Sequence, residues 1–228
     1  MLTKKKKLSK REIKEDKLVT TYYKVYNYFM ENKNRLGMYA GGLAIAVLAI
    51  YFYLSNKASN NEIAGTQLGR VLAIYDAGSY LEAIEGRQGT NIVGLKKIVS
   101  DYGSTNNGEI AKIYLANAYQ MLGKVEEAFD LYKDYGGSNE IFKATALAGE
   151  AGYYAYKKDF EKAADLYLRA SRVSKANVLN PDYMLKAAVN YIEAGNKEEA
   201  KDLLETIRKD YQTSTAFRDV DRYLTLTN

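Results

Sequence analysis

The sequence contains no cysteine, no histidine and only one proline. Without cysteine there can be no disulfide, no thiol nucleophile, no cysteine-ligated metal and no lipidated N-terminal cysteine. Without histidine the chain lacks the commonest general base and the commonest metal ligand. We therefore expect no enzyme, no bound metal and no cofactor.

Positive charge is concentrated at one end of the chain. Residues 1–35 contain 11 Lys and Arg against 4 Asp and Glu, whereas the remaining residues contain 22 against 24. A basic segment of this kind suits nucleic acid, anionic lipid or a topology signal. The lysine run at positions 4–7 has no interleaved aromatic residues for base stacking, so we expect no nucleic-acid partner.

The longest apolar run, residues 36–54, reads LGMYAGGLAIAVLAIYFYL and contains no charged residue. At about 1.5 Å per residue it would span roughly 28 Å, which is close to the hydrocarbon thickness of a bilayer. A buried core helix and a cleaved signal peptide are the alternatives. The polar region before the run is long for a signal peptide, and no small-residue cleavage site follows. The run therefore predicts a retained transmembrane helix.

The flanking charges predict the orientation of this helix. Because positive charge stays cytoplasmic, residues 1–35 form a cytoplasmic tail and residues 55–228 are translocated. The aromatic-rich segment at residues 19–29 is expected at the membrane interface. Gly37 and Gly41 form a small-xxx-small face on which another membrane helix could pack.

Three segments of the translocated part share one spacing of small and aromatic residues. The aligned positions are Ala116, Ala151 and Ala188; Tyr119, Tyr154 and Tyr191; Ala128, Ala163 and Ala200; and Tyr132, Tyr167 and Leu204. A small residue followed three positions later by an aromatic places both on one helical face. The pattern predicts pairs of antiparallel helices that cross closely at the alanines.

Helix ends are also visible within each copy. Gly123 and Gly195 suit the left-handed residue that ends a helix, and Asp159 and Asn196 suit the first cap of the next helix. Pro181 suits the first turn of a helix. We predict an all-α fold: the transmembrane helix, then a solenoid of about four helix pairs and a capping helix. The expected repeats are residues 62–108, 109–143, 144–180 and 181–213, with the cap at 214–228.

Across residues 109–212 this spacing resembles the tetratricopeptide repeat family. The second copy departs from the family pattern, because Lys158 stands where glycine is usual. The resemblance implies a protein-binding scaffold whose concave groove is lined by the first helix of each pair. The candidate groove residues are Ile113, Asn117, Gln120, Met121, Tyr156, Leu185, Val189 and Ile192.

The whole architecture is similar to the ancillary subunit family of the bacterial SecYEG translocon, including the stretch YFMENK at residues 28–33. That resemblance implies an inner-membrane protein with a periplasmic repeat domain, which assists the chaperoning of exported proteins. The implied partners are translocon subunits, a periplasmic chaperone or exported clients, with no small-molecule substrate. The alternative is a scaffold for another envelope assembly, such as cell division or outer-membrane biogenesis.

Overall fold

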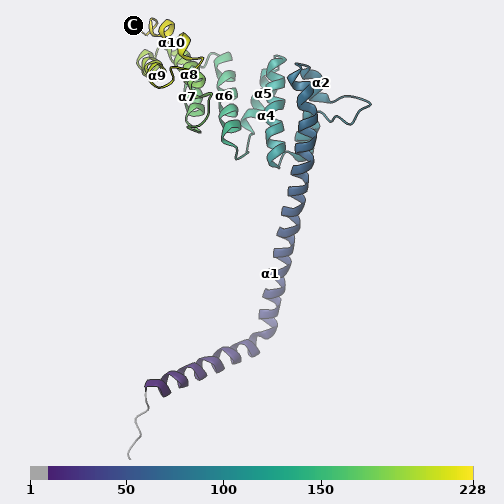
Figure 1. Cartoon of the computed structure of the whole chain (residues 1–228). Coiled ribbons are helices and arrows are strands. Elements are labelled where there is room, and N and C mark those ends of the chain that lie inside the picture. Colours follow the sequence, from purple (N-terminus) through teal and green to yellow (C-terminus); the bar gives the residue numbers. More distant parts are fainter. Residues whose placement is uncertain (1–9, 228) are drawn as a thin grey trace, which may run out of the picture. The chain divides into compact units, whose positions relative to one another are not determined.

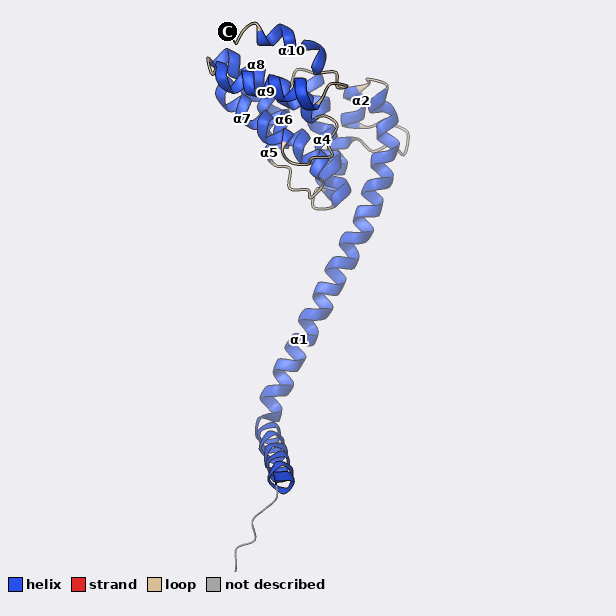
Figure 2. Ribbon diagram, turned by 60° about the vertical axis from the view of Figure 1, so that its left-hand side comes forward, coloured by secondary structure: helices blue, strands red, loops and turns tan. Residues whose placement is uncertain are grey.

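The computed structural model describes residues 10–227, which form ten helices and no strand (Figures 1 and 2). The all-α prediction is therefore confirmed. The chain divides into two compact units, Met1–Asn56 and Lys57–Asn228. The lysine run at positions 4–7 lies outside the described residues.

The first unit is built on the helix α1, Lys10–Asp76, which continues into the second unit. It contains the apolar run at 36–54, whose side chains are exposed except for the half-buried Leu36. By length and composition, α1 is the one helix of the described chain that could cross a membrane. Within the first unit, α1 bends in its N-terminal part (Figures 1 and 2).

Residues 63–75, which belong to the predicted first repeat, are the C-terminal part of α1 and form no separate helix. Between the apolar run and residue 63 the sequence has neither proline nor glycine, so nothing interrupts the backbone hydrogen bonds. Gly65 marks a close approach instead of a break. Its backbone lies against the Asn107 amide, and two hydrogen bonds of 2.8 Å join Asn61 to Asn107.

The second unit continues with nine further helices in the described range. They are α2 (Tyr80–Glu85), α3 (Leu95–Tyr102), α4 (Asn106–Met121), α5 (Val125–Lys133), α6 (Glu140–Tyr156), α7 (Phe160–Ser171), α8 (Asn180–Ala194), α9 (Lys197–Asp210) and α10 (Phe217–Leu224). The pairs α4–α5, α6–α7 and α8–α9 are the three sequence repeats, and each packs on the next. The prediction of a helical-repeat solenoid is confirmed.

The first repeat is less regular than the other three. The stretch between Gly78 and Gly89 contains the short helix α2, whose Ala83 and Ile84 are buried. An isolated bridge then joins Gly86 to Val93. Helix α3 follows with only 8 residues. An extra short helix therefore fills the space beside the C-terminal part of α1.

Burial explains the shared spacing of the repeats. The six aligned alanines are at most 2% exposed, and the aligned Tyr132, Tyr167 and Leu204 are at most 7% exposed. Alanine at these positions lets two helices cross closely, and the larger side chain one turn later fills the space beside the crossing. The core follows the stack in three clusters, from the end of α1 to α10.

The turns inside the helix pairs follow most of the expectations. Gly123 and Gly195 are left-handed, with φ of 74° and 86°. Lys158 adopts the same conformation at φ 64°, in spite of its Cβ atom. The Asp159 side chain accepts a capping hydrogen bond from the backbone N–H of Lys162. Asn196 precedes α9 without such a bond, so its expected capping role is not observed.

The C-terminal cap is shorter than expected. Helix α10 covers Phe217–Leu224, because residues 211–216 form turns held by the Ser214 hydroxyl. Val220 is buried in the last core cluster together with Leu204 and Ile207. The cap therefore closes the stack with one apolar contact face, as a terminal element of a solenoid must.

Candidate protein-binding groove

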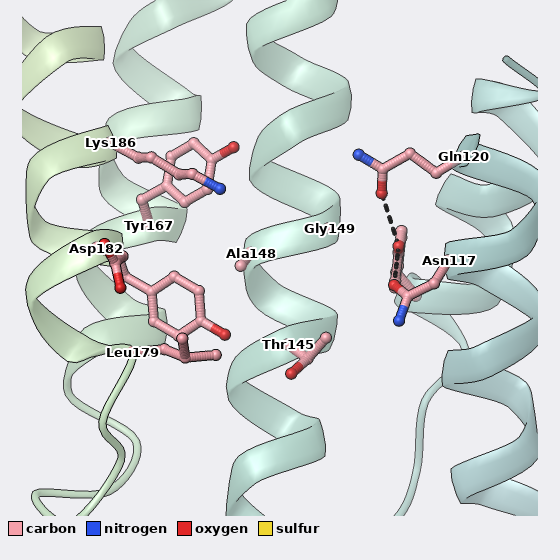
Figure 3. Close-up of a pocket in the computed structure, with 11 residues that line it drawn as sticks. Asn117, Gln120, Thr145, Ala148, Gly149, Tyr167, Leu179, Asp182 and Lys186 are labelled. Atoms are coloured by element: carbon pink, nitrogen blue, oxygen red, sulfur yellow. Dashed lines mark hydrogen bonds between the residues drawn. The ribbon is translucent and has the colours of Figure 1, made fainter. Parts of the chain in front are cut away.

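A groove of about 420 Å³ is lined by residues from α4 to α8. Figure 3 shows α6 in the middle, with α4 on one side and α8 on the other. The middle helix contributes only Thr145, Ala148 and Gly149 to the lining. Because these side chains are small, α6 forms the floor and the flanking helices form the walls.

The α4 wall is built on a hydrogen-bonded amide pair. The Tyr132 hydroxyl lies 2.6 Å from Asn117 Oδ1 and 2.7 Å from Gln120 Oε1 (Figure 3). A hydroxyl has one hydrogen, so it donates to one amide oxygen and accepts from the other amide once that amide turns its NH₂ group inward. The Asn117 side chain also forms a hydrogen bond with Tyr75, so the amides are only partly available to a ligand.

Gly149 allows the Tyr132 ring to lie against α6. A Cβ atom at this position would overlap the ring, and the ring is almost fully buried. Gly152, one turn further along, has more room, because its Cβ would lie 3.5 Å from the Tyr167 hydroxyl oxygen. The glycine at 149 therefore fixes the position of the tyrosine that orients both amides.

The α8 wall carries the two charged residues of the lining, Asp182 and Lys186. The Lys186 ammonium lies 5.6 Å from the centre of the Tyr167 ring. Asp182 accepts a hydrogen bond of 3.0 Å from the Thr215 hydroxyl. One positive and one negative charge leave the groove neutral, with polar groups on both walls.

Three buried or nearly buried tyrosines line the groove, and none is placed to act as a base. Burial raises the pKa of Tyr132, Tyr167 and Tyr183. For Tyr183 the increase is partly offset by polar contacts with Thr145 and Asn177. All three hydroxyls are therefore protonated near neutral pH. In the described part of the chain, no cluster of three or more acidic side chains could hold a metal ion.

Two of the eight groove residues expected from the sequence, Asn117 and Gln120, line this groove. Ile113 does not: it is 1% exposed and packs against Ala116 and Ala146 in the core, so it cannot face a partner. Met121 and Tyr156 are exposed at the C-terminal ends of α4 and α6, outside the lining.

The expected residues of α8 lie beside the groove. Leu185 and Ile192 pack partly buried against the core, and Val189 is half-buried. Asp182 and Lys186 take the groove-facing positions instead. One residue of offset rotates a helical position by about 100°, so a small error in register selects the wrong face.

Thr145, Gly149 and Tyr183 also line the groove, although the repeat pattern does not indicate them. For Tyr132 and Tyr167 the pattern predicts packing only. The sequence signal for these lining residues is the series of small residues in ATALAGEAG, at positions 144–152. It predicts a helix face without bulky side chains. That series alone does not show whether a neighbouring helix or a ligand covers the face.

Gly37 and Gly41 have no partner within the described chain. A Cβ atom at either position would meet nothing within 4 Å. Any close packing there must involve another molecule, so the expected helix contact stays a prediction.

Comparison with protein families matches residues 182–214 to the tetratricopeptide repeat. The match begins in the first turn of α8 and extends beyond the end of α9, so it covers the last helix pair. No curated protein and no solved structure matches the chain. A tetratricopeptide repeat, a helical stack and a neutral groove together support a protein-interaction scaffold. Domains of this kind are typically not catalytic.

Proposed function

We propose that this chain is a membrane-anchored protein-binding accessory factor that assists exported proteins beside the translocon of a bacterial inner membrane. The observation that carries the proposal is the groove over α6, because its walls present amide, hydroxyl, carboxylate and ammonium groups between α4 and α8. The N-terminus would be cytoplasmic and the repeat unit periplasmic. The sequence resemblance supplies the choice of translocon.

The chemistry of the groove suits a polypeptide segment. Peptide groups need both donors and acceptors, and the lining offers amide, hydroxyl, carboxylate and ammonium groups. Ala148, Leu179 and the exposed edges of the buried tyrosines add a small apolar surface. A groove with one charge of each sign does not select strongly for charged ligands, which suits a binder of varied clients.

The apolar run of α1 supplies the tether. Its large side chains are exposed, with Ile45 at 70% and Phe52 at 66%. So much contiguous apolar surface is unfavourable in water and favourable in a bilayer. Anchoring a binder near the site where clients emerge raises its effective concentration, so modest affinity in the groove is sufficient.

Site-specific photocrosslinking in intact membranes tests this proposal. A photoreactive amino acid would replace Thr145 or Lys186 in the groove, and a second series would replace Tyr39 in the apolar run. The matched control is Lys201, an exposed residue of α9 outside the groove lining. Captured proteins are identified by mass spectrometry.

The expected result is capture of exported chains or a periplasmic chaperone from Thr145 and Lys186 but not from Lys201, with translocon subunits captured from Tyr39. Capture of a division or outer-membrane assembly complex from both series would reject the translocon and favour the alternative scaffold. Equal capture from the groove positions and Lys201 would reject the groove as the binding surface.

A further inference from the structure

Besides the apolar run, α1 carries a second apolar surface, nearer its N-terminus. At 100° per residue, six side chains fall within an arc of about 120° on one side of the helix. These are Val19, Tyr22, Tyr23, Tyr26, Phe29 and Met30, and each is 47–65% exposed. The Tyr22 and Tyr26 rings lie nearly parallel, with centres 6.2 Å apart. We call this surface the aromatic face.

Polar residues occupy the opposite side of the same segment. Lys17, Thr20, Lys24, Asn27 and Glu31 project within an arc of about 80°, whose centre lies about 140° from the centre of the aromatic face. Val25 projects between the two sides, whereas Tyr28 projects beside Lys17, about 160° from the centre of the aromatic face. The segment is therefore amphipathic, although the apolar run that follows it is apolar all round.

We propose that residues 17–31 lie along the membrane surface, with the aromatic face in the lipid headgroup region and the lysine side in water. The inference rests on the membrane anchor of the proposed function but not on its groove. A helix with one broad apolar face and a basic polar face binds in the plane of the interface. Tyrosine rings are suited to that depth, since one end is apolar and the other forms hydrogen bonds.

Position in the chain favours a lipid surface over a protein partner. Only residues 32–35 separate this segment from the apolar run, so membrane insertion of the run holds the aromatic face close to the headgroups. The excess of Lys and Arg over acidic residues in 1–35 adds attraction to anionic lipids. An arc of about 120° is also broader than the narrow seam of a two-helix coiled coil.

An in-plane segment joined to a spanning helix requires a change of direction between them. Within the first unit, α1 is bent in its N-terminal part (Figures 1 and 2). The linking residues 32–35 include two asparagines, and Gly37 follows at the start of the apolar run; asparagine and glycine are weak helix formers. Both the observed bend and the local sequence are therefore compatible with the proposed arrangement.

The accessibility of spin labels in the full-length protein tests the proposal. Because the chain has no native cysteine, each introduced cysteine is the only labelled site. The protein is reconstituted in vesicles of about three parts phosphatidylethanolamine to one part phosphatidylglycerol, an anionic surface. Labels at Y22C, Y26C and F29C report the aromatic face. The matched controls K24C, N27C and E31C report the polar side, and L48C reports insertion of the apolar run.

We expect the ratio of oxygen to nickel-chelate accessibility to be several-fold higher at the aromatic-face positions than at the polar-side positions. If all labels from 22 to 31 are equally accessible to water while the label at 48 is exposed to lipid, the in-plane helix is overturned. The membrane anchor would then still stand. A water-accessible label at 48 would overturn the anchor itself. Spin–spin broadening at Y22C and Y26C would show that a second copy covers the face, which also overturns the proposal.

Discussion

At the residue scale, the groove depends on the absence of one side chain. Tyr132 reaches Asn117 and Gln120 only because residue 149 is glycine, so the ring can lie against the α6 backbone. Gly152 is one turn away on the same helix and has ordinary contacts only. The two glycines should therefore respond in opposite ways to the same substitution.

We expect Gly149→Ala to lower the free energy of unfolding by about 1–3 kcal/mol, because the new methyl group overpacks a buried ring. Gly152→Ala should raise it by about 0.5–1 kcal/mol, since alanine favours the helix and meets no close atom. Urea unfolding followed by circular dichroism measures both. Equal effects of the two variants would show that Tyr132 moves aside easily and does not fix the amides.

At the scale of the elements, one buried ammonium joins α4 to the end of α5. Lys112 is 6% exposed and donates to Glu109 Oε1 at 3.0 Å, to Asp134 Oδ2 at 2.8 Å and to the Asp134 carbonyl oxygen at 2.9 Å. Burial lowers the pKa of Lys112, but these hydrogen bonds and charges outweigh burial and raise it. Glu109 also accepts from the backbone N–H of Gly136.

We expect Lys112→Met to lower the free energy of unfolding by about 1–3 kcal/mol, because it leaves Glu109 without its cation in a largely buried position. The matched control is Lys157→Met, which removes an exposed ion pair of similar length, 2.8 Å, to Glu126. That control should leave the melting temperature unchanged. A result in which the two variants have equal melting temperatures would contradict a structural role for the buried lysine.

Which face of each helix lines the groove is also decided at the scale of the elements. The sequence predicts that the first helix of each pair lines it, and α4, α6 and α8 do contribute lining residues. The sequence does not fix the rotation of each helix, because Leu185 and Lys186 are adjacent in the chain but point about 100° apart. Packing of Leu185 against the core decides that Lys186 faces the groove.

At the scale of the whole molecule, buried tyrosines determine how stability responds to pH. The pKa values of Tyr132, Tyr167, Tyr183 and Tyr191 are all raised above the usual 10.0, with burial as the largest cause. Tyr191 also donates a hydrogen bond of 2.6 Å to Asp165, which favours its protonated form. The folded chain therefore holds protons that the unfolded chain releases near pH 10.

We expect the free energy of unfolding to keep its full tyrosine contribution below about pH 10 and to fall above it. The fall should approach about 1.4 kcal/mol per pH unit for each raised tyrosine. Urea titrations of the full chain in detergent from neutral to alkaline pH measure the slope. Tyr132→Phe should reduce the slope, because it removes one of the raised tyrosines. A slope unaffected by Tyr132→Phe would contradict the assignment.

By itself, the sequence determined the apolar run, the asymmetric charge of its flanks, the helix pairs and the buried alanines. Each follows from short-range physics: hydropathy over about 20 residues, 3.6-residue periodicity and the backbone freedom of glycine. Lys158 shows the strength of that local pattern, since it adopts the left-handed turn where Gly123 and Gly195 stand in the other repeats.

Only the tertiary structure decided which side chains meet across helices. Tyr132 and Asn117 are 15 residues apart, and Lys112 and Asp134 are 22 apart, so neither contact has a signature in local sequence. The same holds for the docking of the C-terminal part of α1, where Asn61 and Gly65 meet Asn107. Rotation of a helix about its own axis is set by the neighbours that bury one of its faces, and those neighbours are present only in the folded chain.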